Sequence, residues 1–191
     1  NETKKEFDKK PVLERFDHQL KISGLKTFHT LKPDFSWGCS NIDKLISKYN
    51  LSDYILLFPF CSEHLQQKKW PYYDQLIKLI KQNHPNLKIV IAPGPDEIEK
   101  AKKLDAVSIL KEDKAISISE LAGLIKKSKF VVANDTGPAH MAAHLNVKGL
   151  SLFGSHTTAH KVSIERENFK AIQVSDLKNL SAEKVFERLV F

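Results

Sequence analysis

The chain has 191 residues, of which 41% are hydrophobic and 28% charged, and its formal net charge is +7. These values are typical of a globular protein with one sizeable core. No apolar run approaches the ~18 residues of a membrane-spanning helix, and two cysteines exclude a disulfide framework. The lysines are interspersed with acids, as on solvated helix faces, so no nucleic-acid partner is expected. A positive surface can still attract anionic substrates or the cytoplasmic leaflet of a membrane.

The N-terminal part of the chain contains mainly helical patterns. Residues 1–10 are highly charged and begin with asparagine, so we expect a frayed terminus or a cut linker ahead of a folded domain over residues 11–191. Apolar residues at roughly helical spacing predict a helix over residues 11–23, which Gly24 ends. A second helix is predicted over residues 36–49.

From residue 54 onward, short apolar runs alternate with amphipathic segments. The runs predict strands over residues 54–58, 87–92, 106–110, 130–133, 149–153 and 170–174. The segments predict helices over residues 71–83, 96–104, 117–128, 139–145 and 182–189. Such alternation is typical of βαβ units, so the predicted fold class is α/β, with a Rossmann-like parallel sheet flanked by helices. Ligands bind at the carboxyl ends of the strands in such sheets, which brings together the loops 59–69, 93–97, 134–140 and 154–160.

The stretch over residues 130–145 carries the most informative chemistry. Its apolar strand turns abruptly into a polar turn that contains Asp135 and Thr136. Gly137 permits either an unusual φ or the close approach of a ligand, and Pro138 fits a first helical turn. Strand, turn and helix N-terminus together can bind an anion through free N–H groups and the helix dipole. An ordinary capped turn explains the same pattern, so both interpretations remain open.

The loop over residues 59–69 offers positive charge at the same edge. Ser62, Lys68 and Lys69 precede the N-terminus of the next predicted helix. A hydroxyl, two ammonium groups and a helix N-terminus can together hold a diphosphate. The alternative is a solvated lysine pair, with Trp70 as a packing anchor for the helix.

The loop over residues 93–97 ends in acids. A carboxylate at this place in a Rossmann-like sheet, such as that of Glu97, can accept hydrogen bonds from ribose hydroxyls. Acids in the first turn of a helix also favour its dipole without any ligand, so the two interpretations are equally open.

Two histidine pairs have the spacing of zinc ligands. His140 and His144 are four residues apart, as are His156 and His160. The glutamate of the zinc-protease motif is missing and no cysteine is nearby, so no metal site is expected. The glycine motifs of dehydrogenases, P-loop ATPases and serine hydrolases do not occur.

The order and spacing of four blocks resemble glycosyltransferase family 9, the ADP-heptose:lipopolysaccharide heptosyltransferases. The first two blocks are Leu57-Phe58-Pro59, ahead of a serine-bearing loop, and Lys68-Lys69-Trp70-Pro71. The third, over residues 131–143, contains Asp135-Thr136-Gly137-Pro138 and His140. The fourth is Leu152-Phe153-Gly154 with Thr157. The resemblance extends over roughly residues 11–191.

The resemblance implies the C-terminal half of a two-domain GT-B glycosyltransferase, the half that binds the nucleotide-sugar. Its inverting reaction would use an ADP-sugar, with ADP-heptose as the first choice, and no metal or other cofactor. It assigns contacts to the diphosphate, the sugar, the ribose and the adenine. The corresponding residues are Ser62 and Lys68 at the diphosphate, Asp135, Thr136 and Gly137 at phosphates and sugar, Pro138 and His140 nearby, Glu97 at ribose and Ile116 at adenine. Asp135 is expected to accept hydrogen bonds from the N–H groups of its own turn or from sugar hydroxyls.

Two departures from the family pattern qualify these expectations. Members of the family are roughly twice as long, and their acceptor site and catalytic base lie in the N-terminal half. A lipopolysaccharide-type glycolipid acceptor would therefore be bound through that half, in the cytoplasm at the inner face of the inner membrane. The loop over residues 60–67 also lacks the usual glycine after Pro59. A free-standing nucleotide-binding module without catalysis, or a GT-B nucleotide-sugar epimerase, are the alternative functions.

Overall fold

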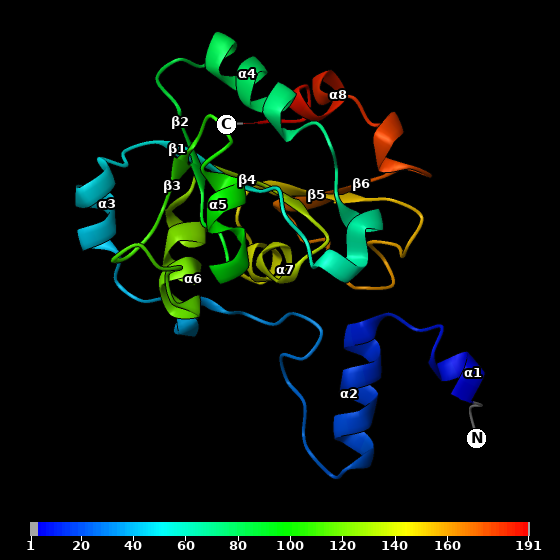
Figure 1. Ribbon diagram of the computed structural model, residues 1–191. Helices are drawn as coiled ribbons and strands as arrows, with labels where there is room; N and C mark the ends of the chain where they lie inside the picture. The colour runs from blue at the N-terminus through cyan, green and yellow to red at the C-terminus, as the bar shows by residue number, and fades with distance from the viewer. Residues whose placement is uncertain (1–3, 191) are drawn as a thin grey trace.

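The structure, a computed structural model, describes residues 4–190 and is built around one parallel β-sheet (Figure 1). The sheet has six strands in the order β3-β2-β1-β4-β5-β6, and every neighbouring pair is parallel. The strands are β1 (Tyr54–Phe58), β2 (Lys88–Ile91), β3 (Val107–Ser108), β4 (Phe130–Asn134), β5 (Gly149–Phe153) and β6 (Phe169–Gln173). The predicted α/β class and the predicted pairing of the four main strands are confirmed.

Helices cover both faces of the sheet because the central strands are apolar on both sides. All residues of β1, β4 and β5 are buried. Alternate side chains of β1 enter two different cores, with Leu56 on one face and Leu57 on the other. In Figure 1, α4 (Tyr73–Asn83) and α8 (Ala182–Phe186) lie above the sheet, and α6 (Ile118–Lys127) and α7 (Gly137–His144) lie below it. The result is a three-layer α/β/α arrangement.

Two of the predicted helices are divided in the structure. The region over residues 36–49 divides into the 3₁₀ turn η1 (Ser36–Gly38) and α3 (Asp43–Tyr49). The break occurs because the Ser40 N–H donates to the carbonyl of Ser119, 2.9 Å away, and so pairs with another part of the chain. The region over 96–104 likewise divides into η3 (Pro95–Glu97) and α5 (Ile98–Ala101).

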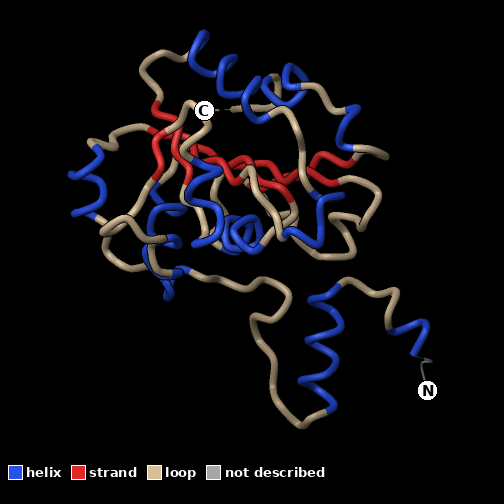
Figure 2. Tube along the Cα trace, in the orientation of Figure 1, coloured by secondary structure: helices blue, strands red, loops and turns tan. Residues whose placement is uncertain are grey.

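The segment ahead of the sheet is arranged differently. A short helix α1 (Lys4–Phe7) and α2 (Val12–Ile22) lie apart from the layers, and Figure 2 shows a long loop joining α2 to the rest. The predicted helix over 11–23 is confirmed, but none of its residues is buried. Its N-terminus is fixed by the Val12 N–H, which donates to the carbonyl of Lys161. Phe16 and Ile22 are exposed, so the apolar side of α2 is uncovered. Residues 1–3 of the predicted frayed terminus lie outside the described residues.

No helix among residues 4–190 combines the length and the apolar character that crossing a membrane requires.

Candidate functional site

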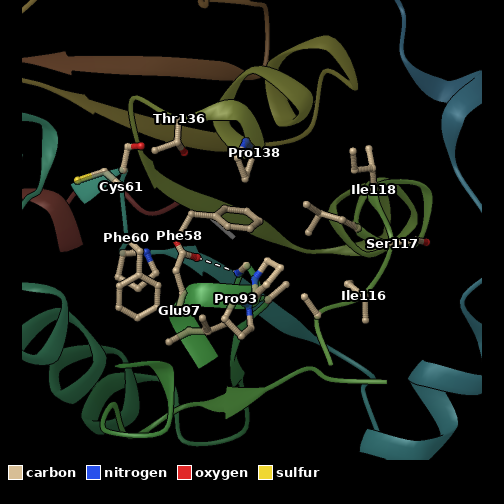
Figure 3. Close-up of a pocket in the computed structure, with 18 residues that line it drawn as sticks. Phe58, Phe60, Cys61, Pro93, Glu97, Ile116, Ser117, Ile118, Thr136 and Pro138 are labelled. Atoms are coloured by element: carbon tan, nitrogen blue, oxygen red, sulfur yellow. Dashed lines mark hydrogen bonds between the residues drawn. The ribbon is translucent and has the colours of Figure 1, made fainter. Parts of the chain in front are cut away.

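An apolar cavity of about 510 Å³ opens at the carboxyl ends of β1 and β2 (Figure 3). Its walls come from the loops after these strands and from the N-terminal ends of α6 and α7. The residues that matter for the site are Phe58, Cys61, Ser62, Pro93, Glu97, Ile116, Ser117, Thr136 and Pro138. The predicted residues Ser62, Glu97, Ile116, Thr136 and Pro138 therefore line one cavity.

The polar group on one wall of this cavity is the carboxylate of Glu97. Its Oε2 accepts the N–H of Gly94 at 2.8 Å, the bond drawn in Figure 3. Its Oε1 has no hydrogen-bond partner among residues 4–190. Pro93 and Ile116 provide flat apolar surface close by. One carboxylate oxygen can thus accept hydrogen bonds from hydroxyl groups of a ligand, while the planar part of that ligand lies against the apolar walls.

Beside the cavity, Lys68 and Asp135 form an ion pair. The Nζ atom of Lys68 lies 2.7 Å from Oδ2 of Asp135 and 3.4 Å from its carbonyl oxygen. The Asp135 side chain is only 3% exposed, whereas that of Lys68 is 22% exposed. Lys69 is exposed, and its side chain forms no hydrogen bond or ion pair among residues 4–190. The structure therefore distinguishes the two lysines of the loop and brings Lys68 to the turn after β4.

Two histidines complete the surroundings of Asp135. Nε2 of His140 lies 3.4 Å from Oδ1, and Nε2 of His156 lies 3.1 Å from Oδ2. Burial raises the pKa of Asp135, but hydrogen bonds from His140, Lys68 and His156 and the charge of Lys68 outweigh it, so the pKa lies well below its ordinary value. The carboxylate thus stays ionised, and both of its oxygens have partners.

These contacts correct one of the two expected roles of Asp135. Its partners in the structure are side chains from three different segments, not the N–H groups of its own turn. The contact with sugar hydroxyls stays a prediction. His156 and His160 do not share a helix face, because the loop that contains them is not helical. His156 could have been suspected only from its place in a loop that meets the same edge of the sheet. Its contact with Asp135 joins residues that are 21 positions apart, and a local sequence pattern cannot predict such a contact.

Asn134 and Trp70 hold the lysine loop in place. Asn134 is the last residue of β4 and fully buried, and its Oδ1 accepts the N–H of Trp70 at 3.1 Å. The Trp70 ring is buried, and its Nε1 donates to the carbonyl of Leu180 at 2.7 Å. Trp70 is thus the packing anchor that the sequence suggested, and it fixes the chain two residues after Lys68. The predicted strand ended at residue 133, but Asn134 is part of β4, and its side chain ties the strand to this loop.

The turn into α7 presents backbone rather than side chains. Thr136 is the N-cap residue, but its hydroxyl donates to the carbonyl of Asn134 instead of capping the helix. Pro138 occupies the first helical turn, as predicted. Gly137 does not have a positive φ, so of the two alternatives for this glycine the close approach of a ligand stays a prediction. Its N–H has no partner within the described part of the chain, and an added Cβ would meet nothing within 4 Å outside its two chain neighbours. Apart from the constraint that Pro138 places on the residue before it, a requirement for glycine here comes from something that approaches this backbone.

A Gly137→Ala substitution tests whether this glycine serves the fold or the approach of a ligand. We expect the free energy of unfolding to change by no more than about 1 kcal/mol, since the methyl group has room and alanine suits a helix. The affinity for a diphosphate ligand should fall if the ligand packs on the backbone. Chemical unfolding and calorimetry measure the two effects. An unchanged affinity would show that the ligand does not approach Gly137.

The chemistry of the site follows from this geometry. One ammonium group and one unpaired N–H at a helix N-terminus lie at the edge of an apolar cavity with a carboxylate on its wall. The positive groups suit a phosphate or diphosphate, and the cavity suits a planar ring with an attached sugar. Among residues 4–190, no cluster of three His, Cys, Asp or Glu side chains could hold a metal ion.

Comparison with known proteins identifies the family. The model of glycosyltransferase family 9 (heptosyltransferase) matches residues 5–189. The chain belongs to glycosyltransferase family 9. Lipopolysaccharide heptosyltransferase 1 of Campylobacter coli is 29% identical to this family 9 chain, over 55% of the chain and 33% of that protein.

Solved structures share the fold of this family 9 chain. The E. coli heptosyltransferase WaaC with ADP has a TM-score of 0.67 and 22% identity, covering 91% of this chain and 54% of that one. The UDP-GlcNAc 2-epimerase of Methanocaldococcus jannaschii has a TM-score of 0.55 and 17% identity, covering 93% and 52%. The family 9 chain thus spans about half the length of these structures and a third of the curated relative.

Proposed function

We propose that this chain binds the nucleotide-sugar of a glycosyltransferase that acts in lipopolysaccharide core or related surface-glycan synthesis. The sugar donor would be an ADP-sugar, with ADP-heptose as the first choice. Family membership supports the reaction class, and the curated relative is a lipopolysaccharide heptosyltransferase. The nucleotide would be adenine-based because ADP occupies the solved relative WaaC.

The observation that carries the proposal is the position of the Lys68–Asp135 pair beside the apolar cavity. The adenine would lie against Ile116 and the ribose would reach the free Oε1 of Glu97. The diphosphate would then meet Lys68 and the N–H of Gly137. These groups would stabilise the negative charge that develops on the leaving diphosphate when the sugar is transferred.

The acceptor and the catalytic base would belong to a second half of the protein. The acceptor hydroxyl must lose a proton to a general base. We propose that the base and the site for a lipopolysaccharide-type glycolipid lie in an N-terminal domain, since this chain covers only 54% of the solved relative WaaC. The uncovered apolar side of α2, with Phe16 and Ile22 exposed, supports contact with such a domain. The enzyme would work in the cytoplasm at the inner face of the inner membrane.

Binding of ADP tests the proposed function directly. We expect the chain to bind ADP without a divalent ion, because Lys68 and the α7 N-terminus supply the positive charge. Calorimetry should show the same affinity for ADP with a chelator and with added Mg²⁺, and a weaker affinity for UDP. Loss of ADP binding in chelator would contradict this account. A preference for UDP-GlcNAc over ADP would favour the epimerase alternative.

A further inference from the structure

We propose that His156 is a positioning residue for diphosphate recognition. By donating to Asp135, it would share this carboxylate with Lys68 and leave the ammonium group able to turn toward the diphosphate. The inference rests on the proposed function, because it concerns the same site.

His156 is fixed in the geometry of a hydrogen-bond donor. Its Nε2 lies 3.1 Å from Oδ2 of Asp135, the same oxygen that Lys68 contacts at 2.7 Å. The imidazole is only 6% exposed and stacks on Phe153 with the ring planes 13° apart. Its Nδ1 is buried without a hydrogen-bond partner among the described residues. A proton on Nε2 fits these surroundings, because Nε2 faces a carboxylate oxygen, whereas an N–H at Nδ1 would be buried and unpaired.

The role of His156 follows from the burial of Asp135. A carboxylate that is 3% exposed is costly to leave without partners. When Lys68 moves toward a diphosphate, its contact with Oδ2 lengthens. His156 keeps Oδ2 hydrogen-bonded, and His140 keeps a donor near Oδ1. Lys68 can therefore leave the carboxylate at a lower cost than if it were the only partner.

His156 reaches the carboxylate from a different part of the fold. It lies in the loop after β5, whereas Lys68 precedes α4 and His140 belongs to α7. A substitution of His156 should therefore affect ligand binding only through Asp135 and Lys68. Binding of the adenosine part at the apolar cavity should not depend on it.

Two substitutions separate hydrogen bonding from packing. His156→Phe retains a ring that can stack on Phe153 but removes the N–H donor, whereas His156→Gln retains an N–H donor. We expect His156→Phe to weaken ADP binding about tenfold and His156→Gln clearly less, since a hydrogen bond to a charged group is lost only in the first. Adenosine affinity should be unchanged in both. His160 is exposed and lies in the same loop, so His160→Ala is the control. This variant should bind ADP normally.

A double substitution tests the route through Lys68. In the Lys68→Ala background, His156→Phe should cause no further loss of ADP affinity. Equal losses for ADP and adenosine, or an undiminished loss in that background, would overturn the role of His156 while leaving the proposed function intact. Failure of the unchanged chain to bind ADP would overturn both.

A spectroscopic measurement covers the case in which His156→Phe does not fold. Imidazole ¹⁵N spectra of the unchanged protein should show the Nε2 signal of His156 shifting on addition of ADP and not on addition of adenosine. Equal shifts with the two ligands would overturn the inference.

Discussion

Replacing Asp135 by asparagine is expected to lower the free energy of unfolding by about 2–4 kcal/mol at pH 7. The buried carboxylate accepts hydrogen bonds from Lys68, His140 and His156. The asparagine amide would offer one acceptor fewer and place N–H groups against N–H donors. Urea unfolding at pH 7 measures the loss. Asp105→Asn removes a largely exposed carboxylate and should change stability by less than about 0.5 kcal/mol. Equal effects of the two substitutions would show that the contacts of Asp135 add no more to the free energy of unfolding than those of an exposed carboxylate.

The same substitution predicts a particular pH dependence. The pKa of Asp135 in the folded protein lies below its ordinary value of 3.8. A carboxyl group with a lowered pKa contributes stability above its unfolded pKa, and this contribution is lost as the pH falls through the folded pKa. The stability difference between the parent and Asp135→Asn should therefore be largest above about pH 5 and should narrow below about pH 4. Unfolding curves at several pH values would detect it. A difference that grows on acidification would contradict the ion-pair account.

The fold was predictable where local pattern and tertiary structure agree. The strands over 54–58 and 149–153 have the predicted bounds, because both are short apolar runs buried on both faces of the sheet. The helix over 36–49 was wrong in its first part, because Ser40 uses its N–H for a contact with Ser119. Only the folded chain brings these two serines together. Periodicity alone therefore could not place the break.

The site was predictable as a set of loops but not as a set of contacts. The rule that ligands bind at carboxyl ends of parallel strands correctly brought together the segments with Glu97, Lys68 and Asp135. It could not choose between Lys68 and Lys69, because that choice depends on how Trp70 is anchored by Asn134. It could not find His156 either. Both depend on hydrogen bonds between segments more than twenty residues apart.

A Lys68→Ala substitution should weaken both ligand binding and the fold. Loss of a charge-assisted contact should cost about 1.5–3 kcal/mol of ADP binding. A lysine in a loop is ordinarily dispensable for the fold. The structure changes that expectation, because removal of the lysine deprives a buried carboxylate of its cation. We expect a further loss of about 1–3 kcal/mol in the free energy of unfolding, lower than for a fully buried pair, because Lys68 is 22% exposed and two histidines remain.

Lys69→Ala is the matched control for this experiment. It removes the same charge from the neighbouring position, but the Lys69 side chain is exposed and does not contact Asp135. Any long-range attraction of an anionic ligand to the positive surface is reduced equally in both variants. Calorimetry with ADP and urea unfolding should therefore show large effects for Lys68→Ala and small ones for Lys69→Ala. If the two variants lose ADP affinity to the same extent, only the net charge matters and the contact of Lys68 with the diphosphate is wrong. If Lys68→Ala loses stability but binds ADP normally when folded, the lysine serves Asp135 alone and the diphosphate must be held elsewhere.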